Sequence, residues 1–86
     1  MRLRIEITEG AKRHIANHNV RAEDVIRIFE RDYFVKRGGK RYELIGQTRA
    51  GRFLTLFMEK EKDKFKLITA RDATKAEKEL YKKRVK

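Results

Sequence analysis

The sequence contains no cysteine. This excludes disulfide bonds, thiolate metal sites and cysteine nucleophiles, and because it is compatible with a reducing compartment we expect a cytoplasmic protein. Long apolar runs are also missing: residues 1–7 alternate charged and apolar side chains, unlike a signal peptide or a membrane span. We therefore expect neither export nor insertion into a membrane.

The residue sets that hold metals or nucleotides are poorly represented. His14 and His18 are four residues apart, but no His-Glu-x-x-His context and no carboxylate ligand accompany them. Gly38, Gly39 and Lys40 lack the spacing of a P-loop, and no helix is predicted to follow them. We predict no metal and no cofactor, and we expect His18 to interact with the dipole of a helix end.

Acidic residues are the minority among the charged ones. Lys and Arg total 24 against 13 Asp and Glu, which gives a net charge of +11 and a field that attracts a phosphate-rich partner or an acidic protein. The chain has 86 residues, too few for two cores, so we predict a single domain over residues 1–86. Hydrophobic residues make up 40% of the sequence, which is enough for one core.

The first third of the chain shows strand and helix patterns in succession. Residues 3–7 alternate as in a strand with one buried face. Thr8 is placed to cap a helix that runs to about residue 18 with Ala11 and Ile15 facing inward, and Asn19 suits a left-handed stop. A second amphipathic helix, over about residues 22–31, would bury a stripe of four side chains. These are Ala22, Val25, Ile26 and Phe29.

The remainder alternates with the period of strands and closes with a helix. We predict a short edge strand at 33–35, a mobile basic loop at 36–40, and an antiparallel meander over 41–47, 52–59 and 65–70 with 60–64 as a charged connection. Gly51 can take the positive φ of the first turn. The middle strand is apolar on both alternating sets and should be central, with both faces covered. Thr74 and Glu77 match a capping box that begins a final helix.

Particular segments carry a family resemblance in addition to this α+β order. They are His18-Asn19-Val20 before the second helix, residues 41–48 (Arg-Tyr-Glu-Leu-Ile-Gly-Gln-Thr), Gly51-Arg52-Phe53-Leu54, and residues 68–74 (Ile-Thr-Ala-Arg-Asp-Ala-Thr) followed by Glu77 and Tyr81. The chain resembles the BrnT family of RelE-like ribonuclease toxins over nearly its whole length. It departs from the family in Thr69 for the commoner Ser, in Arg21 without a capping side chain, and in the missing Trp-Asp pair of the first strand.

The resemblance implies a RelE-like fold, with an antiparallel β-sheet, two N-terminal helices and a C-terminal helix, and an endoribonuclease that cleaves RNA without a metal. Such an enzyme must deprotonate a 2′-hydroxyl, stabilise charge on phosphate and protonate the leaving oxygen. Arg71, Arg52 and Tyr81 are our candidates for catalysis. Glu77 and His18 are further possible members of the site.

Each candidate also has a structural interpretation. Arg71 could grip a phosphate beside the last helix or pair with Glu77 or Asp72. Arg52 could be a solvated charge at a hairpin end, and Tyr81 could pack its ring with Leu80 in the core. For Glu77 we favour the capping role over catalysis.

Further basic residues belong to the predicted basic loop or follow it directly, and we expect them to bind the RNA backbone without specifying bases. They are Arg41, Lys40, Lys36 and Arg37. The family resemblance also implies a cognate antitoxin, a DNA-binding protein of the same operon that neutralises the toxin. The alternative is a non-catalytic module of the same fold that binds RNA or an acidic protein. A DNA-binding regulator ranks last, because the sequence has no evident helix-turn-helix signature.

Overall fold

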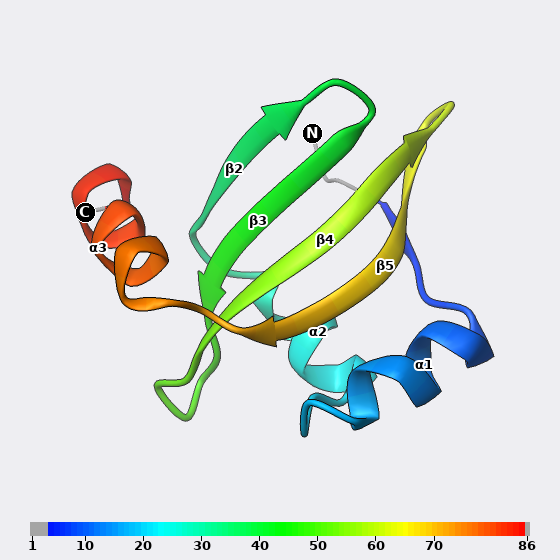
Figure 1. Cartoon of the computed structure of the whole chain (residues 1–86), viewed down its shortest axis with the longest axis horizontal. Coiled ribbons are helices and arrows are strands. Elements are labelled where there is room, and N and C mark those ends of the chain that lie inside the picture. The colour runs from blue at the N-terminus through cyan, green and yellow to red at the C-terminus, as the bar shows by residue number, and fades with distance from the viewer. Residues whose placement is uncertain (1–3, 86) are drawn as a thin grey trace.

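The computed structural model describes residues 4–85, and Figure 1 shows an α+β arrangement in which helices flank one sheet. In chain order the elements are β1 (Ile5–Glu6), α1 (Glu9–Ala16), α2 (Ala22–Ile28), β2 (Tyr33–Gly38), β3 (Arg41–Gln47), β4 (Phe53–Glu61), β5 (Lys64–Asp72) and α3 (Lys75–Arg84). The predicted order is confirmed. The first residue of the predicted first strand, Leu3, lies outside the described residues.

The five strands form one sheet in the order β1-β5-β4-β3-β2. Strands β2 to β5 are antiparallel neighbours, whereas β1 pairs in parallel with β5. The predicted meander, the central position of β4 and the edge position of β2 are therefore confirmed. A bulge in the β4–β5 ladder, between Phe57 and Met58, shifts the register of β5.

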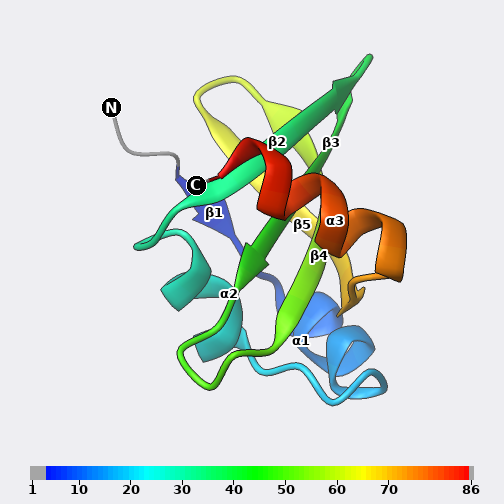
Figure 2. The same ribbon diagram turned by 90° about the vertical axis from the view of Figure 1, so that its left-hand side faces the viewer.

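The two faces of the sheet carry different side chains. One face presents Leu44, Leu56 and Met58 to α1 and α2, whose Ile15, Val25 and Ile28 complete a buried core. The neighbouring positions along the same strands, such as Ile45 and Thr55, point to the opposite face. Figure 2 shows α3 crossing the sheet on that opposite side, and the helix contacts β2 and β3.

Local backbone signals in the sequence act as predicted. Thr8 caps α1 by accepting from Ala11 N–H at 3.1 Å, and Asn19 takes a φ of 61°. Gly51 has a φ of 92° in the turn before β4. Arg21 makes no side-chain cap for α2, and its own N–H instead donates to Asp24 Oδ2 at 3.0 Å. None of the helices within residues 4–85 is long and apolar enough to cross a membrane.

Several predicted details are wrong. Ile26 is 48% exposed, and Ile28 occupies the core in its place, because the inward stripe of the short helix α2 runs through Val25, Ile28 and Phe29. The predicted basic loop at 36–40 belongs largely to β2, and the connection at 60–64 belongs largely to β4 and β5. Both hairpins close tightly instead, with positive φ at Gly39 and at Lys62.

Candidate functional site

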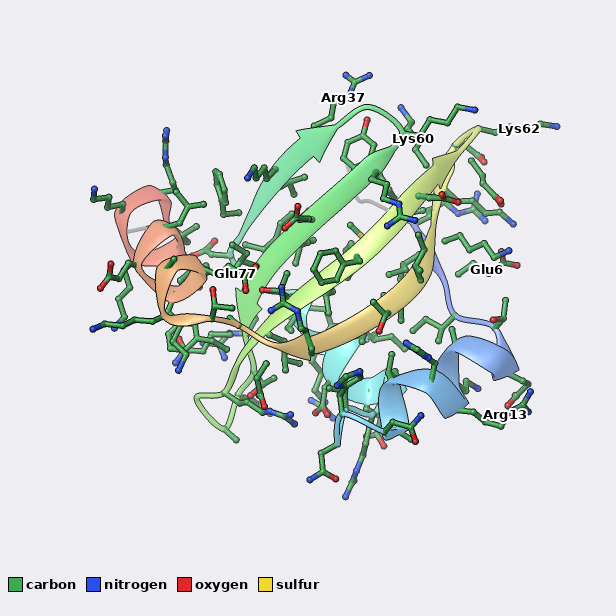
Figure 3. The ribbon with its side chains drawn as sticks, viewed as in Figure 1. Glu6, Arg13, Arg37, Lys60, Lys62 and Glu77 are labelled. Atoms are coloured by element: carbon green, nitrogen blue, oxygen red, sulfur yellow. The ribbon has the colours of Figure 1, made fainter. Side chains whose placement is uncertain are left out.

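Arg71 lies near the end of β5, where the strand passes into α3. Its register partner on β4 is Thr55, whose partner on β3 is Ile45, so the three side chains share the face of the sheet that carries α3. Thr74 then begins α3 through a capping box with Glu77. Figure 3 shows Glu77 on the first turn of α3, turned toward the sheet. The predicted place of Arg71, between the final strand and the final helix, is confirmed.

Glu77 joins the strand end to the helix through four hydrogen bonds. Its Oε1 accepts from Arg71 Nη1 (2.9 Å), from Thr55 Oγ1 (2.9 Å) and from Thr74 N–H (2.8 Å), while Oε2 accepts from Arg71 Nη2 at 3.1 Å. Burial by itself raises the pKa of Glu77, but the bonds from Arg71, Thr74 and Thr55 outweigh it and lower the pKa to about 2. Glu77 is therefore an ionised anchor, and its capping role is confirmed.

The guanidinium of Arg71 is held along one edge and open along the other. Nη1 donates to Glu77 and to the carbonyl of Asp72 at 3.0 Å, and Nη2 donates to Glu77. Of its five N–H donors, Nε–H and one N–H of Nη2 have no acceptor among the described residues. These two donors lie side by side, as bidentate binding of a phosphate requires. The hydrogen bond to Glu77 raises the pKa of Arg71, so the group is a permanent cation.

Two further side chains surround Arg71. Its Cζ lies 5.0 Å from the centre of the Phe57 ring, a cation–π contact. Glu43 is the register partner of Phe57 on β3 and faces the same side, and its charge adds to the effect of Glu77 on the pKa of Arg71. Phe57 and Glu43 are both half-buried.

Tyr81 lies one turn beyond Glu77 on α3. Its ring packs edge-on against Phe53, with centroids 5.5 Å apart, and its hydroxyl donates to the carbonyl of Asp32 at 3.3 Å. The structure therefore shows the packing interpretation, although against Phe53 rather than with Leu80. Its catalytic role stays a prediction.

Arg52 is not brought together with Arg71. Its Nε donates to Asp72 Oδ1 at 2.6 Å, while Nη1 and Nη2 donate to the carbonyls of Asn19 (2.6 Å) and His18 (2.9 Å). These acceptors lie on the α1 side of the sheet, because Asp72 and Arg71 are consecutive in β5 and point to opposite faces. The hydrogen bond from Arg52 lowers the pKa of Asp72 and raises that of Arg52. This arrangement supports a role in joining the α1–α2 turn to the sheet.

The remaining candidates lie at two other places. The His18 ring is exposed beyond α1 and lies 5.9 Å from the His14 ring, on the same side as Arg52. The basic residues of the β2–β3 hairpin are exposed at the far end of the sheet from α3, where Figure 3 also places Lys60 and Lys62. They are Lys36, Arg37, Lys40 and Arg41. Lys60 N–H donates to the carbonyl of Lys40, so the β4–β5 hairpin continues this basic surface.

Arg71 lines neither of two surface hollows formed by the described residues. One, of about 460 Å³, lies beside α2 and the β3–β4 turn, and another, of about 530 Å³, lies at the β4–β5 hairpin. The Arg71 side chain is 35% exposed, so its face of the sheet is an open strip. An open strip suits an extended polymer better than a small molecule.

Sequence reasoning missed Thr55, Phe57 and Glu43 as members of this site. The signal for Thr55 and Phe57 was present in β4, where Phe53, Thr55 and Phe57 alternate with the core residues and place a hydroxyl between two rings. What the sequence lacked was the register, which sets Thr55 opposite Arg71 and Glu43 opposite Phe57.

Comparison with known proteins finds a structural neighbour but no sequence relative. No family profile matches the chain, and no curated protein matches it in sequence. The crystal structure of the Brucella abortus ribonuclease toxin BrnT superposes with a TM-score of 0.62 at 17% sequence identity, over 85% of this chain and 99% of that protein. The chain is therefore similar in fold to a ribonuclease toxin, and this α+β fold is the property that the comparison establishes.

Proposed function

We propose that this protein is a toxin-type endoribonuclease that binds RNA across the α3 side of the sheet and holds the scissile phosphate on Arg71. The observation that carries the proposal is the free edge of the Arg71 guanidinium, fixed in place by Glu77 on an open strip. The likeness in fold to the Brucella abortus ribonuclease toxin supports the choice of RNA as substrate.

In the proposed reaction the 2′-oxygen of RNA loses its proton and attacks phosphorus, and the 5′-oxygen leaves with a proton. Arg71 stabilises the negative charge that develops on the phosphate. Glu77 acts as a positioning residue, because its oxygens already accept four hydrogen bonds and its low pKa makes it a poor proton acceptor. Tyr81 remains the proposed proton-exchanging group, and it must release the Asp32 carbonyl to act.

Lys36, Arg37, Lys40 and Arg41 are proposed to bind the RNA backbone beyond the cleavage site. Their exposure at the hairpin end and the net charge of +11 support this role, because closely spaced cations bind phosphates and release counterions. The reaction is proposed to need no metal and no cofactor, and to take place in the cytoplasm. A cognate antitoxin with an acidic surface is the proposed restraint on this activity.

The test is an incubation of purified protein with mixed-sequence single-stranded RNA in the presence of a chelator. Wild-type protein is expected to cleave the RNA. Arg71→Ala should cleave at least about 100-fold more slowly, because removing one hydrogen-bond donor to the charge of a transition state has an effect of this size. Arg13→Ala is the matched control, because it removes one positive charge from the exposed surface of α1. Circular dichroism of all three proteins checks the fold. Equal cleavage by Arg71→Ala and Arg13→Ala would remove Arg71 from the site.

A non-catalytic RNA-binding or acidic-protein-binding module is the second candidate. One observation favours it: the Glu77 carboxylate beside Arg71 accepts four hydrogen bonds and has a pKa of about 2, so it is a poor base for a 2′-hydroxyl. Salt-sensitive RNA binding without cleavage, either alone or with added ribosomes, would select this function. Cleavage that stops in chelator and returns with a divalent cation would instead refute metal independence.

A further inference from the structure

Beyond Arg71, the α3 side of the sheet continues into a strip that α3 does not cover. Ladder pairing places Lys36, Glu43, Phe57 and Thr69 in one row across four strands, so their side chains point to the same face. The contacts of α3 fall on the preceding rows. They involve Phe34, Phe53, Thr55 and Arg71. The row with Phe57 is thus the first open surface next to the proposed phosphate site.

Phe57 places an aromatic ring in the middle of this open row. Neither α1 nor α2 can cover it, because both pack on the other face, and α3 stops short of it. A half-buried ring on an exposed sheet is a common platform for single-stranded RNA, whose unstacked bases lie on aromatic side chains and on arginine planes. Here both kinds of plane are adjacent, since Arg71 Cζ lies 5.0 Å from the ring centre.

Glu43 is an unexpected neighbour for a phosphate polymer. It is half-buried, and its carboxylate has no hydrogen-bond or ion-pair partner among residues 4–85. Such a group repels phosphate, but it accepts hydrogen bonds from the N–H groups of a base. Only guanine presents two adjacent donors, N1–H and the 2-amino group, that match the two carboxylate oxygens. On the Watson–Crick edges of adenine, cytosine and uracil, each hydrogen-bond donor lies beside an acceptor, so these bases do not match the carboxylate.

We propose that Phe57 and Glu43 form a guanine-binding site beside Arg71, with the base stacked on the Phe57 ring and its Watson–Crick edge bound by the Glu43 carboxylate. This inference rests on the proposed binding of RNA to the same face, and it makes Glu43 a specificity-determining residue. The guanine would then be the base adjacent to the phosphate that Arg71 holds.

The test uses short uridine-rich 2′-O-methyl oligonucleotides, which cannot be cleaved because their 2′-oxygen is blocked. They differ in one central base, which is guanine, hypoxanthine, adenine or cytosine, and binding is measured by fluorescence anisotropy at low salt. Wild type should bind the guanine oligonucleotide about tenfold more tightly than the adenine one. Hypoxanthine lacks the 2-amino group and should lie between them.

Two variants and one control assign the preference to residues. Glu43→Gln should lose the guanine preference, and Glu23→Gln, which makes the same charge change on the exposed surface of α2, should keep it. Glu43→Gln should therefore bind the guanine oligonucleotide more weakly than wild type does. The adenine and cytosine oligonucleotides should bind to both variants slightly more tightly, since each variant removes one negative charge. Phe57→Leu should weaken binding of all oligonucleotides by about fivefold or more through loss of stacking.

The outcomes separate this inference from the function on which it rests. Equal affinity for all four bases, a preference for another base, or a guanine preference that survives in Glu43→Gln would overturn the guanine site and leave RNA binding standing. Failure of wild type to bind any oligonucleotide at low salt would overturn both. Loss of the preference in Glu43→Gln alone, with Glu23→Gln unchanged, would establish the site even if Phe57→Leu failed to fold.

Discussion

The two faces of the sheet differ in what their side chains do, although the same strands form both. The face toward α1 and α2 is sealed by aliphatic side chains, among them Leu44, Leu56 and Met58, none of which is exposed. The face toward α3 is held by hydrogen bonds and ring contacts, and α3 itself buries no residue completely. The first face supplies stability, and the second leaves polar groups free to bind a ligand.

The two arginines at this end of the sheet show the same contrast. All three guanidinium nitrogens of Arg52 donate to the protein, and two of its acceptors are backbone carbonyls of the α1–α2 turn. Arg71 donates to protein through Nη1 and Nη2 and keeps Nε–H without a partner among the described residues. Each arginine uses three of its five N–H donors within the described residues, so the position of the free donors distinguishes them: only Arg71 keeps Nε–H free beside a free N–H of Nη2.

The largest expected effect compares equivalent truncations on the two faces. Leu56→Ala should lower the free energy of unfolding by about 3 kcal/mol, because it opens a cavity in the sealed core. Phe57→Ala should cost roughly 1–2 kcal/mol, since the ring is only half-buried. Urea denaturation followed by circular dichroism measures both. Equal losses of unfolding free energy would mean that the α3 face contributes as much to stability as the face toward α1 and α2.

Gly46 tests how closely the sealed face is packed. A Cβ at this position would lie 2.5 Å from Ile28 Cγ2, so Gly46→Ala should destabilise the protein by about 2 kcal/mol through overpacking. Adding Ile28→Ala removes the obstructing methyl group and should make the cost of Gly46→Ala much smaller in that background. An unchanged cost in the double-mutant cycle would place the strain elsewhere.

Arg52→Ala sharpens the comparison between the arginines. It leaves the carbonyls of His18 and Asn19 without their donor and should cost about 2 kcal/mol in unfolding free energy. RNA cleavage, measured at a temperature where the variant is folded, should stay within about threefold of wild type, as for loss of one distant charge. A large loss of cleavage by folded Arg52→Ala would instead support the catalytic role predicted from the sequence.

Acid should weaken the α3 face through protonation of Glu77. The pKa of Glu77 is about 2 in the folded protein against an ordinary value of 4.5, so its stabilising contribution is complete above pH 4.5 and is lost as pH falls toward 2. Glu77→Gln should be less stable at pH 7 by about 1 kcal/mol, because Arg71 is partly exposed and its pairing is weakened by solvent. The difference between the two proteins should shrink on acidification, and a constant difference from pH 7 to 2 would contradict this role.

Much of the fold follows from local patterns in the sequence. The caps at Thr8 and Thr74, the left-handed Asn19 and the turn glycine Gly51 were all predicted, because each acts through its own neighbours within a few residues. Ile26 was misplaced because in a helix as short as α2 the sequence period allows two adjacent stripes. Which stripe is buried depends on how the sheet lies against the helix.

The residues of the candidate site also fall into two groups: those whose proximity the sequence predicts, and those that only the pairing of strands brings together. Arg71 and Glu77 are six residues apart and meet across a strand end and a helix cap, so their proximity was predictable from the chain itself. Thr55, Phe57 and Glu43 join them through ladder pairing between strands, and a shift of one residue in that register would turn each to the other face.

The sequence by itself thus determined the order of elements, the ends of the helices and the positive charge, since these depend on short-range chemistry and composition. Only the tertiary structure decided that Arg52 faces α1 and that Arg71 faces α3. The reason is physical: consecutive residues of a strand point to opposite faces, so function here depends on which helix covers which face.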